Sequence, residues 1–183
     1  MKSRGAVPED TVRALGLAAV ANVHELVEAA NRLEEAEDDE LVDLRGHKAR
    51  AIALSILAAE ELAKALACSL VLEHAGDDPE DWRGFWSVFG RRRHEEKIDA
   101  LLGLEALVIA HAKDAPDNLA DAFRKENAAE LFELKNRAMY VDIEGGEIRT
   151  PTQVVDDESL ARAKRIRKSA TIWAIALSLN MEG

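Results

Sequence analysis

The clearest candidates for chemistry lie in the middle of a long apolar run. Glu60, Glu61 and Lys64 occur within Ala51–Leu72, where almost every other residue is apolar. Residues three and four apart share neighbouring faces of a helical turn, so Lys64 can reach both carboxylates. Charged groups on a largely buried helix are rarely unpaired, because their desolvation is costly. The pattern therefore predicts either an internal ion pair that stabilises a helical bundle or a polar pocket in its core.

A second polar group follows three consecutive arginines. His94 and Lys97 are three residues apart at the start of an expected helix, so they lie on the same face of it. The amino end of a helix offers free N–H groups that bind phosphates and other anions. The segment therefore indicates either a solvated basic turn or an anion site.

A third group lies where an expected helix ends and an extended segment begins. It consists of Lys135, Asn136, Arg137, Tyr140 and Asp142. Such a junction can present side chains to a site, although ordinary capping of the helix end explains the same residues. A turn containing Gly145 and Gly146 follows, and the segment ends at Pro151.

In order and approximate spacing, these motifs resemble the AbiV family of abortive-infection proteins, a phage-defence branch of the HEPN superfamily. The resemblance rests on Glu60-Glu61 with Lys64, on His94 with Lys97, and on Asn136–Asp142 with the glycine turn and Pro151. It spans about Ala51–Pro151. It implies an all-α, HEPN-like helical bundle and a role in defence, but it does not imply a particular reaction.

Many HEPN proteins are metal-independent ribonucleases that carry an arginine, four to six residues, and then a histidine. None of the 5 histidines here has an arginine at that distance upstream, so the strict motif is absent. The nearest counterpart is Lys135-Asn136, three residues, and then Tyr140. Lysine lacks the bidentate fork of arginine, and an unperturbed tyrosine titrates near pH ~10 and is a poorer base than histidine at neutral pH. The resemblance leaves an endoribonuclease open, with His94, Lys135, Asn136 and Tyr140 as candidate catalytic residues.

A metal site is the weaker interpretation of the same residues. Glu60, Glu61, His94 and Asp142 could supply oxygen and nitrogen ligands. No tight histidine–carboxylate spacing supports such a site, and nearby lysines would repel a cation. We therefore expect neither a metal nor another cofactor.

The spacing of apolar residues predicts the elements that position these groups. Helices are expected at about 11–37, 46–74, 94–113, 118–124, 128–139 and 157–180, with a small hairpin or ordered loop at about 140–151. The aromatic run Trp82, Phe85, Trp86 and Phe89 predicts a short amphipathic helix that packs on the core. The acidic stretch Glu34–Glu40 is expected to be solvated. We expect one domain over 1–183, with a HEPN-like core at about 46–151 and flanking helices.

Composition limits the classes of function. The net charge of −11 opposes non-specific binding to nucleic acid. The single cysteine, Cys68, excludes an intrachain disulfide and is expected to be buried. Residues 1–10 lack an apolar signal core, which indicates a cytoplasmic address. Charges at the centre of the 46–74 helix argue against a membrane span.

These observations lead to one functional hypothesis and two alternatives. We expect an abortive-infection effector that binds a phage or host protein and blocks growth or translation. A ribonuclease acting on RNA and a structural, antitoxin-like partner are the alternatives. The candidate binding residues are Glu60, Glu61, Lys64, Lys97, Arg137 and Asp142, which we expect to converge with His94 and Tyr140 on one pocket. The apolar surface of the 46–74 helix and of the run around Trp173 predicts a homodimer.

Overall fold

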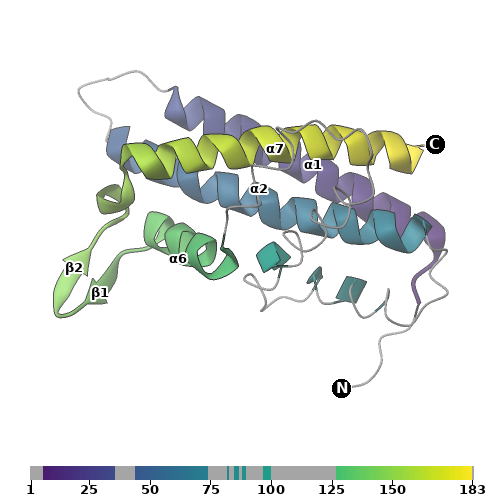
Figure 1. The fold of residues 1–183 in the computed structure, drawn as a ribbon, viewed down its shortest axis with the longest axis horizontal. Helices are drawn as coiled ribbons and strands as arrows, with labels where there is room; N and C mark the ends of the chain where they lie inside the picture. The colour runs from purple at the N-terminus through teal and green to yellow at the C-terminus, as the bar shows by residue number, and fades with distance from the viewer. Residues whose placement is uncertain are drawn as a thin grey trace.

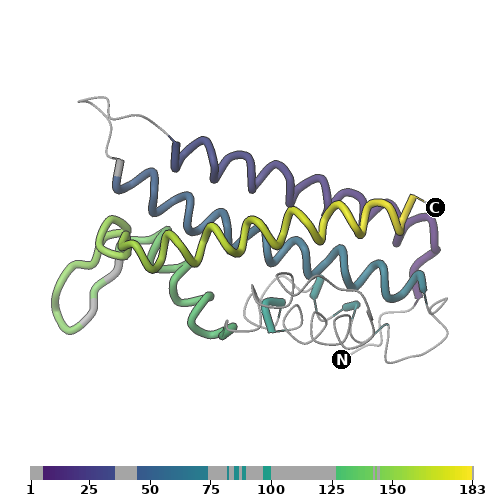
Figure 2. The backbone as a smooth tube through the Cα atoms, turned by 45° about the horizontal axis from the view of Figure 1, so that its top comes forward, coloured from purple at the N-terminus to yellow at the C-terminus, as the bar shows by residue number. Residues whose placement is uncertain are grey.

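Three long helices run side by side along the molecule (Figures 1 and 2). The computed structural model describes residues 6–35, 44–73 and 127–182, together with 82, 85–86, 88–89 and 97–99. The long helices are α1 (Glu9–Glu34), α2 (Leu44–Glu73) and α7 (Asp157–Glu182). The shorter α6 (Ala128–Met139) packs against α2, which also contacts α1 and α7. Helix α2 is therefore the centre of the bundle.

Local sequence explains where these helices begin. Helix α1 follows Pro8 and carries Glu9 and Asp10 in its first turn, where the helix dipole favours acids. Helix α6 is capped by Asn127, whose side chain accepts from the backbone N–H of Ala129 at 2.9 Å. The Asp156 carboxylate accepts from the backbone N–H of Ser159 at 2.7 Å at the start of α7, and this hydrogen bond lowers the pKa of Asp156.

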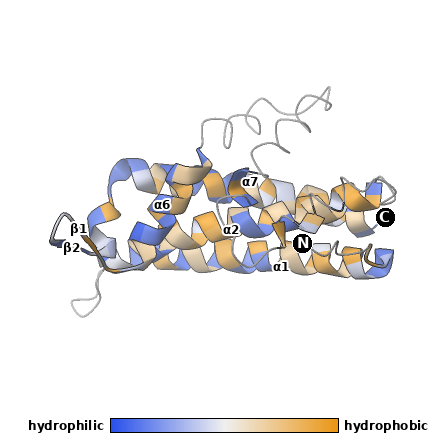
Figure 3. Ribbon diagram, turned by 90° about the horizontal axis from the view of Figure 1, so that it is seen from below, coloured by the Kyte–Doolittle hydropathy of each residue, from blue (hydrophilic) through white to orange (hydrophobic). Residues whose placement is uncertain are grey.

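Small residues let the three long helices approach closely. Helix α2 buries alanines on several sides, among them Ala51, Ala59 and Ala63. A Cβ added at Gly16 on α1 would lie 2.9 Å from the Cβ of Cys68 and would also overlap the Met181 sulfur of α7. Cys68 is fully buried as predicted, and burial raises the pKa of its thiol to about 12. Figure 3 shows apolar residues distributed along the length of the bundle.

A short hairpin extends from one end of the bundle (Figure 1). Strands β1 (Asp142–Glu144) and β2 (Glu147–Arg149) pair antiparallel, with Ile143 opposite Ile148. Gly145 and Gly146 form the connection with φ values of 62° and 87°. A two-residue turn with both φ angles positive matches the twist of the flanking strands and favours glycine. A 3-10 helix, η1 (Pro151–Val154), then leads towards α7.

The predicted fold class is confirmed: the chain is an all-α bundle with a small hairpin. The predicted helix at 128–139 has the observed bounds, and those at 11–37, 46–74 and 157–180 agree within a few residues. The predicted helix at 118–124 and most of that at 94–113 lie outside the described residues, although 97–99 are helical. In the aromatic run, Phe85 is buried and makes edge contacts with Trp82 and Trp86, so the expected core packing is confirmed. Within the described ranges, no helix has both the length and the apolarity needed to cross a membrane.

The first prediction concerns Gly16, where α1, α2 and α7 meet. Gly16→Val should lower stability by about 1–3 kcal/mol, because the added side chain must displace the side chains of Cys68 and Met181. Ala18→Val is the matched control, since Ala18 is exposed on the same helix and the change there costs only about 0.7 kcal/mol of helix propensity at most. Urea denaturation of both variants measures the difference. Equal midpoints would contradict close packing at Gly16.

Candidate functional site

Helix α2 places two of the predicted carboxylates differently. The Glu60 side chain is 2% exposed, whereas that of Glu61 is 19% exposed and pairs with Lys64. The prediction that a carboxylate of this turn pairs with Lys64 is therefore confirmed. Glu61 and Lys64 lie at the edge of the core, because consecutive residues of a helix point about 100° apart.

Helix α6 supplies the partner of Glu60. The Lys135 ammonium lies 2.5 Å from Glu60 Oε1, and its side chain is 5% exposed. The same ammonium lies 4.9 Å from the centre of the Phe132 ring, which adds a cation–π contact. Residues 75 positions apart in the sequence thus form a buried ion pair between α2 and α6.

Lys97 completes a cluster that we call the α2–α6 cluster: Glu60, Glu61, Lys64, Lys97 and Lys135. Burial lowers the pKa of Lys97, and the positive charges of Lys64 and Lys135 lower it further. The carboxylates of Glu60 and Glu61 act in the opposite direction. Lys97 is 6% exposed. Three lysines therefore share one buried region with two glutamates.

The other predicted site residues are not part of this cluster in the described structure. Arg137 has a side chain 43% exposed, 4.0 Å from Glu133, and its charge also acts on Asp156. Tyr140 caps the end of α6 and is 59% exposed, and Asn136 is half-buried and accepts the Tyr140 backbone N–H. His94 and the Asp142 side chain lie outside the described residues, so convergence of the whole set stays a prediction.

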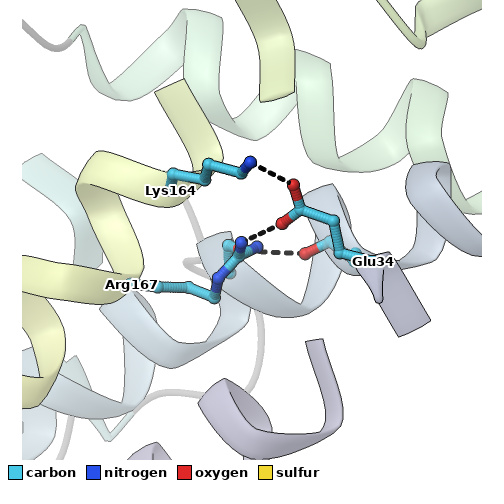
Figure 4. A network of polar contacts seen from close by, with 5 residues as sticks. Glu34, Lys164 and Arg167 are labelled. Atoms are coloured by element: carbon cyan, nitrogen blue, oxygen red, sulfur yellow. Dashed lines mark hydrogen bonds and ion pairs between the residues drawn. The ribbon is translucent and has the colours of Figure 1, made fainter. Parts of the chain in front are cut away.

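Sequence reasoning missed a second polar group, which lies between α1 and α7. Arg167 of α7 donates to Ser55 Oγ of α2 at 2.9 Å and to the Glu34 carboxylate of α1. The Lys164 ammonium lies 2.8 Å from the other Glu34 oxygen, and Figure 4 shows both cations directed at this carboxylate. Burial raises the pKa of Glu34, but the hydrogen bonds and charges of Lys164 and Arg167 outweigh it, so the net pKa is lowered.

The expectation that Glu34 is solvated is wrong. Its side chain is only 12% exposed, because α7 covers the end of α1 and brings two cations to it. The basic run Arg162–Lys168 could have indicated this group from the sequence. Arg167 lies on the same face of the helix as the apolar Ile166 and Ala170, which are buried. A cation on the core-facing side of a helix requires an acid from another element.

The described residues gather no group of three histidine, cysteine or acidic side chains that could hold a metal ion.

Comparison with known proteins identifies the family. The model of the HEPN family described as AbiV matches residues 11–171, which is most of the chain. This chain belongs to the AbiV family. The match extends beyond the segment of about 51–151 that carries the motifs, and it includes most of α1 and half of α7. No curated protein and no solved structure matches the chain.

Membership of the AbiV family indicates a role in abortive infection, a form of phage defence. In this AbiV protein the lysine nearest to the ribonuclease arginine position, Lys135, contacts Glu60 inside the bundle. Its observed contact is structural.

The second prediction compares the two lysines of the α2–α6 cluster. Lys135→Ala should cost about 3–5 kcal/mol, because it leaves the Glu60 carboxylate buried without this partner. Lys64→Ala should cost about 1 kcal/mol or less, since the Glu61–Lys64 pair is partly exposed and Glu61 can be hydrated. Chemical denaturation of both variants tests this order.

The matched control removes both buried charges. Glu60→Gln with Lys135→Met should recover part of the stability that Lys135→Ala loses, because the side chain that faced Lys135 is then uncharged. A Lys64→Ala variant as unstable as Lys135→Ala would show that the difference in burial does not set the energetics.

Proposed function

We propose that this AbiV-family protein acts in phage defence by binding a phage or host protein and thereby blocking growth or translation. The observation that carries the proposal is the buried Glu60–Lys135 ion pair at 2.5 Å. It occupies the lysine that a ribonuclease of this superfamily would need at the RNA phosphate. Defence by binding requires no catalytic group.

The geometry gives the ribonuclease alternative little support. Lys135 is 5% exposed, and moving it to a phosphate would leave Glu60 buried without its partner. Tyr140 is 59% exposed, so it does not share the buried surroundings of Lys135.

The hairpin offers the surface for a protein partner. Alternation along the strands places Val141, Ile143 and Ile148 on one face, and they are 66%, 70% and 67% exposed. A two-stranded hairpin is only marginally stable by itself in water. An exposed apolar face on such an element is typical of a contact surface.

We favour another protein, rather than a second copy of this chain, as the partner that binds the apolar face of the hairpin. Three side chains cover far less than the roughly 800 Å² per partner of a stable interface. A second hairpin could not supply the missing area, whereas a larger partner can also contact the adjoining end of the bundle. A partner that carries basic groups would complement the net charge of −11.

The third prediction tests the hairpin in cells exposed to phage. Ile143→Ser with Ile148→Ser should abolish phage resistance, because it removes the apolar contact face. The melting temperature should change by only a few degrees, since neither side chain is buried. Efficiency of plating and thermal denaturation measure the two effects. Total RNA, sampled after infection, should remain intact in cells that carry the unmodified protein.

Two control variants make this test specific. Glu147→Thr with Arg149→Thr alters the opposite face of β2 and should retain resistance. Tyr140→Phe removes only the hydroxyl and should also retain it, whereas a ribonuclease that uses this group as its base would lose activity. RNA fragmentation that disappears in Tyr140→Phe would overturn the proposal in favour of the ribonuclease.

We further propose that the protein is a homodimer that associates through α7. Ile172, Ile175 and Leu179 recur at helical spacing and are 37%, 51% and 69% exposed. Trp173, around which we expected the exposed run, instead packs against the core. A continuous apolar stripe along one helix is typical of a symmetric contact between two identical helices.

The fourth prediction concerns this stripe. Ile175→Glu should convert the dimer to a monomer, because two glutamates would face each other across the symmetry axis. Light scattering coupled to gel filtration measures the mass, and Ala18→Glu at an exposed position of α1 is the control. A monomeric mass for the unmodified protein at micromolar concentration would refute the dimer.

A further inference from the structure

The apolar stripe of α7 has a charged residue at each end. Ile172, Ile175 and Leu179 form the stripe, and the exposed side chains of Lys168 and Glu182 continue it in the two directions. Lys168 lies seven residues before Ile175, and Glu182 lies seven residues after it. Seven residues make almost two full turns of a helix, so the two charges lie on the same face of α7 as the stripe.

Lys168 stands at the rim of a positively charged pocket. The pocket, of about 450 Å³, opens between the carboxy-terminal end of α1 and α7 and is called the α1–α7 pocket. Three cations line it, Lys164, Arg167 and Lys168, against the two carboxylates Glu34 and Glu35. Both oxygens of Glu34 are engaged, by Lys164 and by Arg167, and Lys168 forms no ion pair with a described residue. The pocket therefore has an excess of positive charge next to the stripe.

Glu182 is an acid of matching position at the other end of the stripe. Its Oε1 accepts a hydrogen bond from the Ser178 hydroxyl at 3.0 Å, and it forms no ion pair within the described part of the chain. A carboxylate has two oxygens and can accept from a lysine ammonium while it keeps this contact. The stripe thus ends in a cation on one side and in an anion on the other.

A two-fold axis at Ile175 would bring these opposite charges together. In an antiparallel pair of α7 helices, residues equally far before and after the axis lie at the same level, here about 10 Å from it along the helix. Lys168 of one copy then faces Glu182 of the other, and Ile172 of one copy falls between Ile175 and Leu179 of the other. In a parallel pair, each of the two charges would face its own kind and be repelled. The charges therefore favour the antiparallel arrangement.

We propose that two copies associate through antiparallel α7 helices and that Glu182 of each copy pairs with Lys168 at the rim of the other copy's α1–α7 pocket. The apolar stripe supplies the contact area, and the two symmetric ion pairs fix its direction and register. The carboxylate of the second copy also offsets the excess positive charge of the pocket. This pairing rests on the homodimer proposed above and adds the residues that orient the two copies.

Cross-linking of the full-length protein with a short bismaleimide tests the arrangement. The native Cys68 is fully buried and shielded from the reagent. Ile175→Cys should cross-link, because this position meets its own copy at the axis. The variant with both Lys168→Cys and Glu182→Cys should also cross-link. Neither of these two substitutions alone should do so, since its two copies would lie about 21 Å apart along the helices.

Charge exchange tests the ion pairs, with sedimentation equilibrium as the measurement. Lys168→Glu and Glu182→Lys should each raise the dimer Kd about tenfold, because two exposed attractions become repulsions. The variant with both changes restores opposite charges, and its Kd should return to within about threefold of that of the unmodified protein. Glu25→Lys, at an exposed position of α1, changes the net charge as Glu182→Lys does and should alter the Kd by no more than about twofold.

The possible failures are distinguishable. A monomeric unmodified protein, with no cross-link in Ile175→Cys, would overturn the α7 dimer and the pairing with it. If Ile175→Cys cross-links but the variant with Lys168→Cys and Glu182→Cys does not, or if either of these substitutions cross-links alone, the dimer stands and the antiparallel pairing is wrong. A double charge-exchange variant that associates as weakly as the single variants would overturn the ion pairs.

Discussion

The ion pair between Glu60 of α2 and Lys135 of α6 is the contact on which the position of the hairpin depends. Both side chains are almost fully buried, so each charge would be costly without the other. The pair therefore fixes both the distance and the register of α6 against α2. Tyr140 ends α6, and β1 begins two residues later, so a displacement of α6 would move the hairpin with it.

Helix α2 takes part in both buried polar groups of the described structure. Ser55 accepts from Arg167 of α7, and five residues further on Glu60 pairs with Lys135 of α6. Alanines between and beyond them keep the neighbouring helices close, and Gly16 does the same for α1. Because most side chains between these helices are short, the helices pack closely. The few long polar side chains between them therefore have little conformational freedom.

The charged groups of the α2–α6 cluster and those between α1 and α7 differ in their exposure to solvent. In the α2–α6 cluster, Glu60, Lys97 and Lys135 are buried while Glu61 and Lys64 lie at the edge, and the Lys135–Glu60 contact uses the lysine that resembles a ribonuclease residue. Between α1 and α7, Arg167 and Lys164 are fixed by Glu34 yet line an open pocket, with Lys168 beside them. The first arrangement suits a rigid support for a binding element. The second leaves Lys164 and Lys168 exposed to solvent beside a fixed guanidinium.

Local sequence patterns were sufficient to predict most of the helices, the hairpin and the family. Periodic apolar residues, the cap at Asn127, the glycine pair at 145–146 and Pro151 act over a few neighbouring residues, so the helix at 128–139 and the hairpin could be predicted closely. The order of the polar motifs was enough to indicate an AbiV resemblance, which the family match confirms.

The tertiary structure alone decided which charges meet. Sequence spacing correctly paired Glu61 with Lys64, which are three residues apart, but it could not reveal that Glu60 contacts Lys135 or that Glu34 contacts Arg167. Those partners are separated by 75 and 133 residues, and only the packing of α6 and α7 brings them together. Helical periodicity indicates which face of a helix a residue occupies. The burial of its side chain and the identity of its ion-pair partner depend on the helix that covers that face. For this reason Glu34 looked solvated in the sequence and is buried under α7 in the fold.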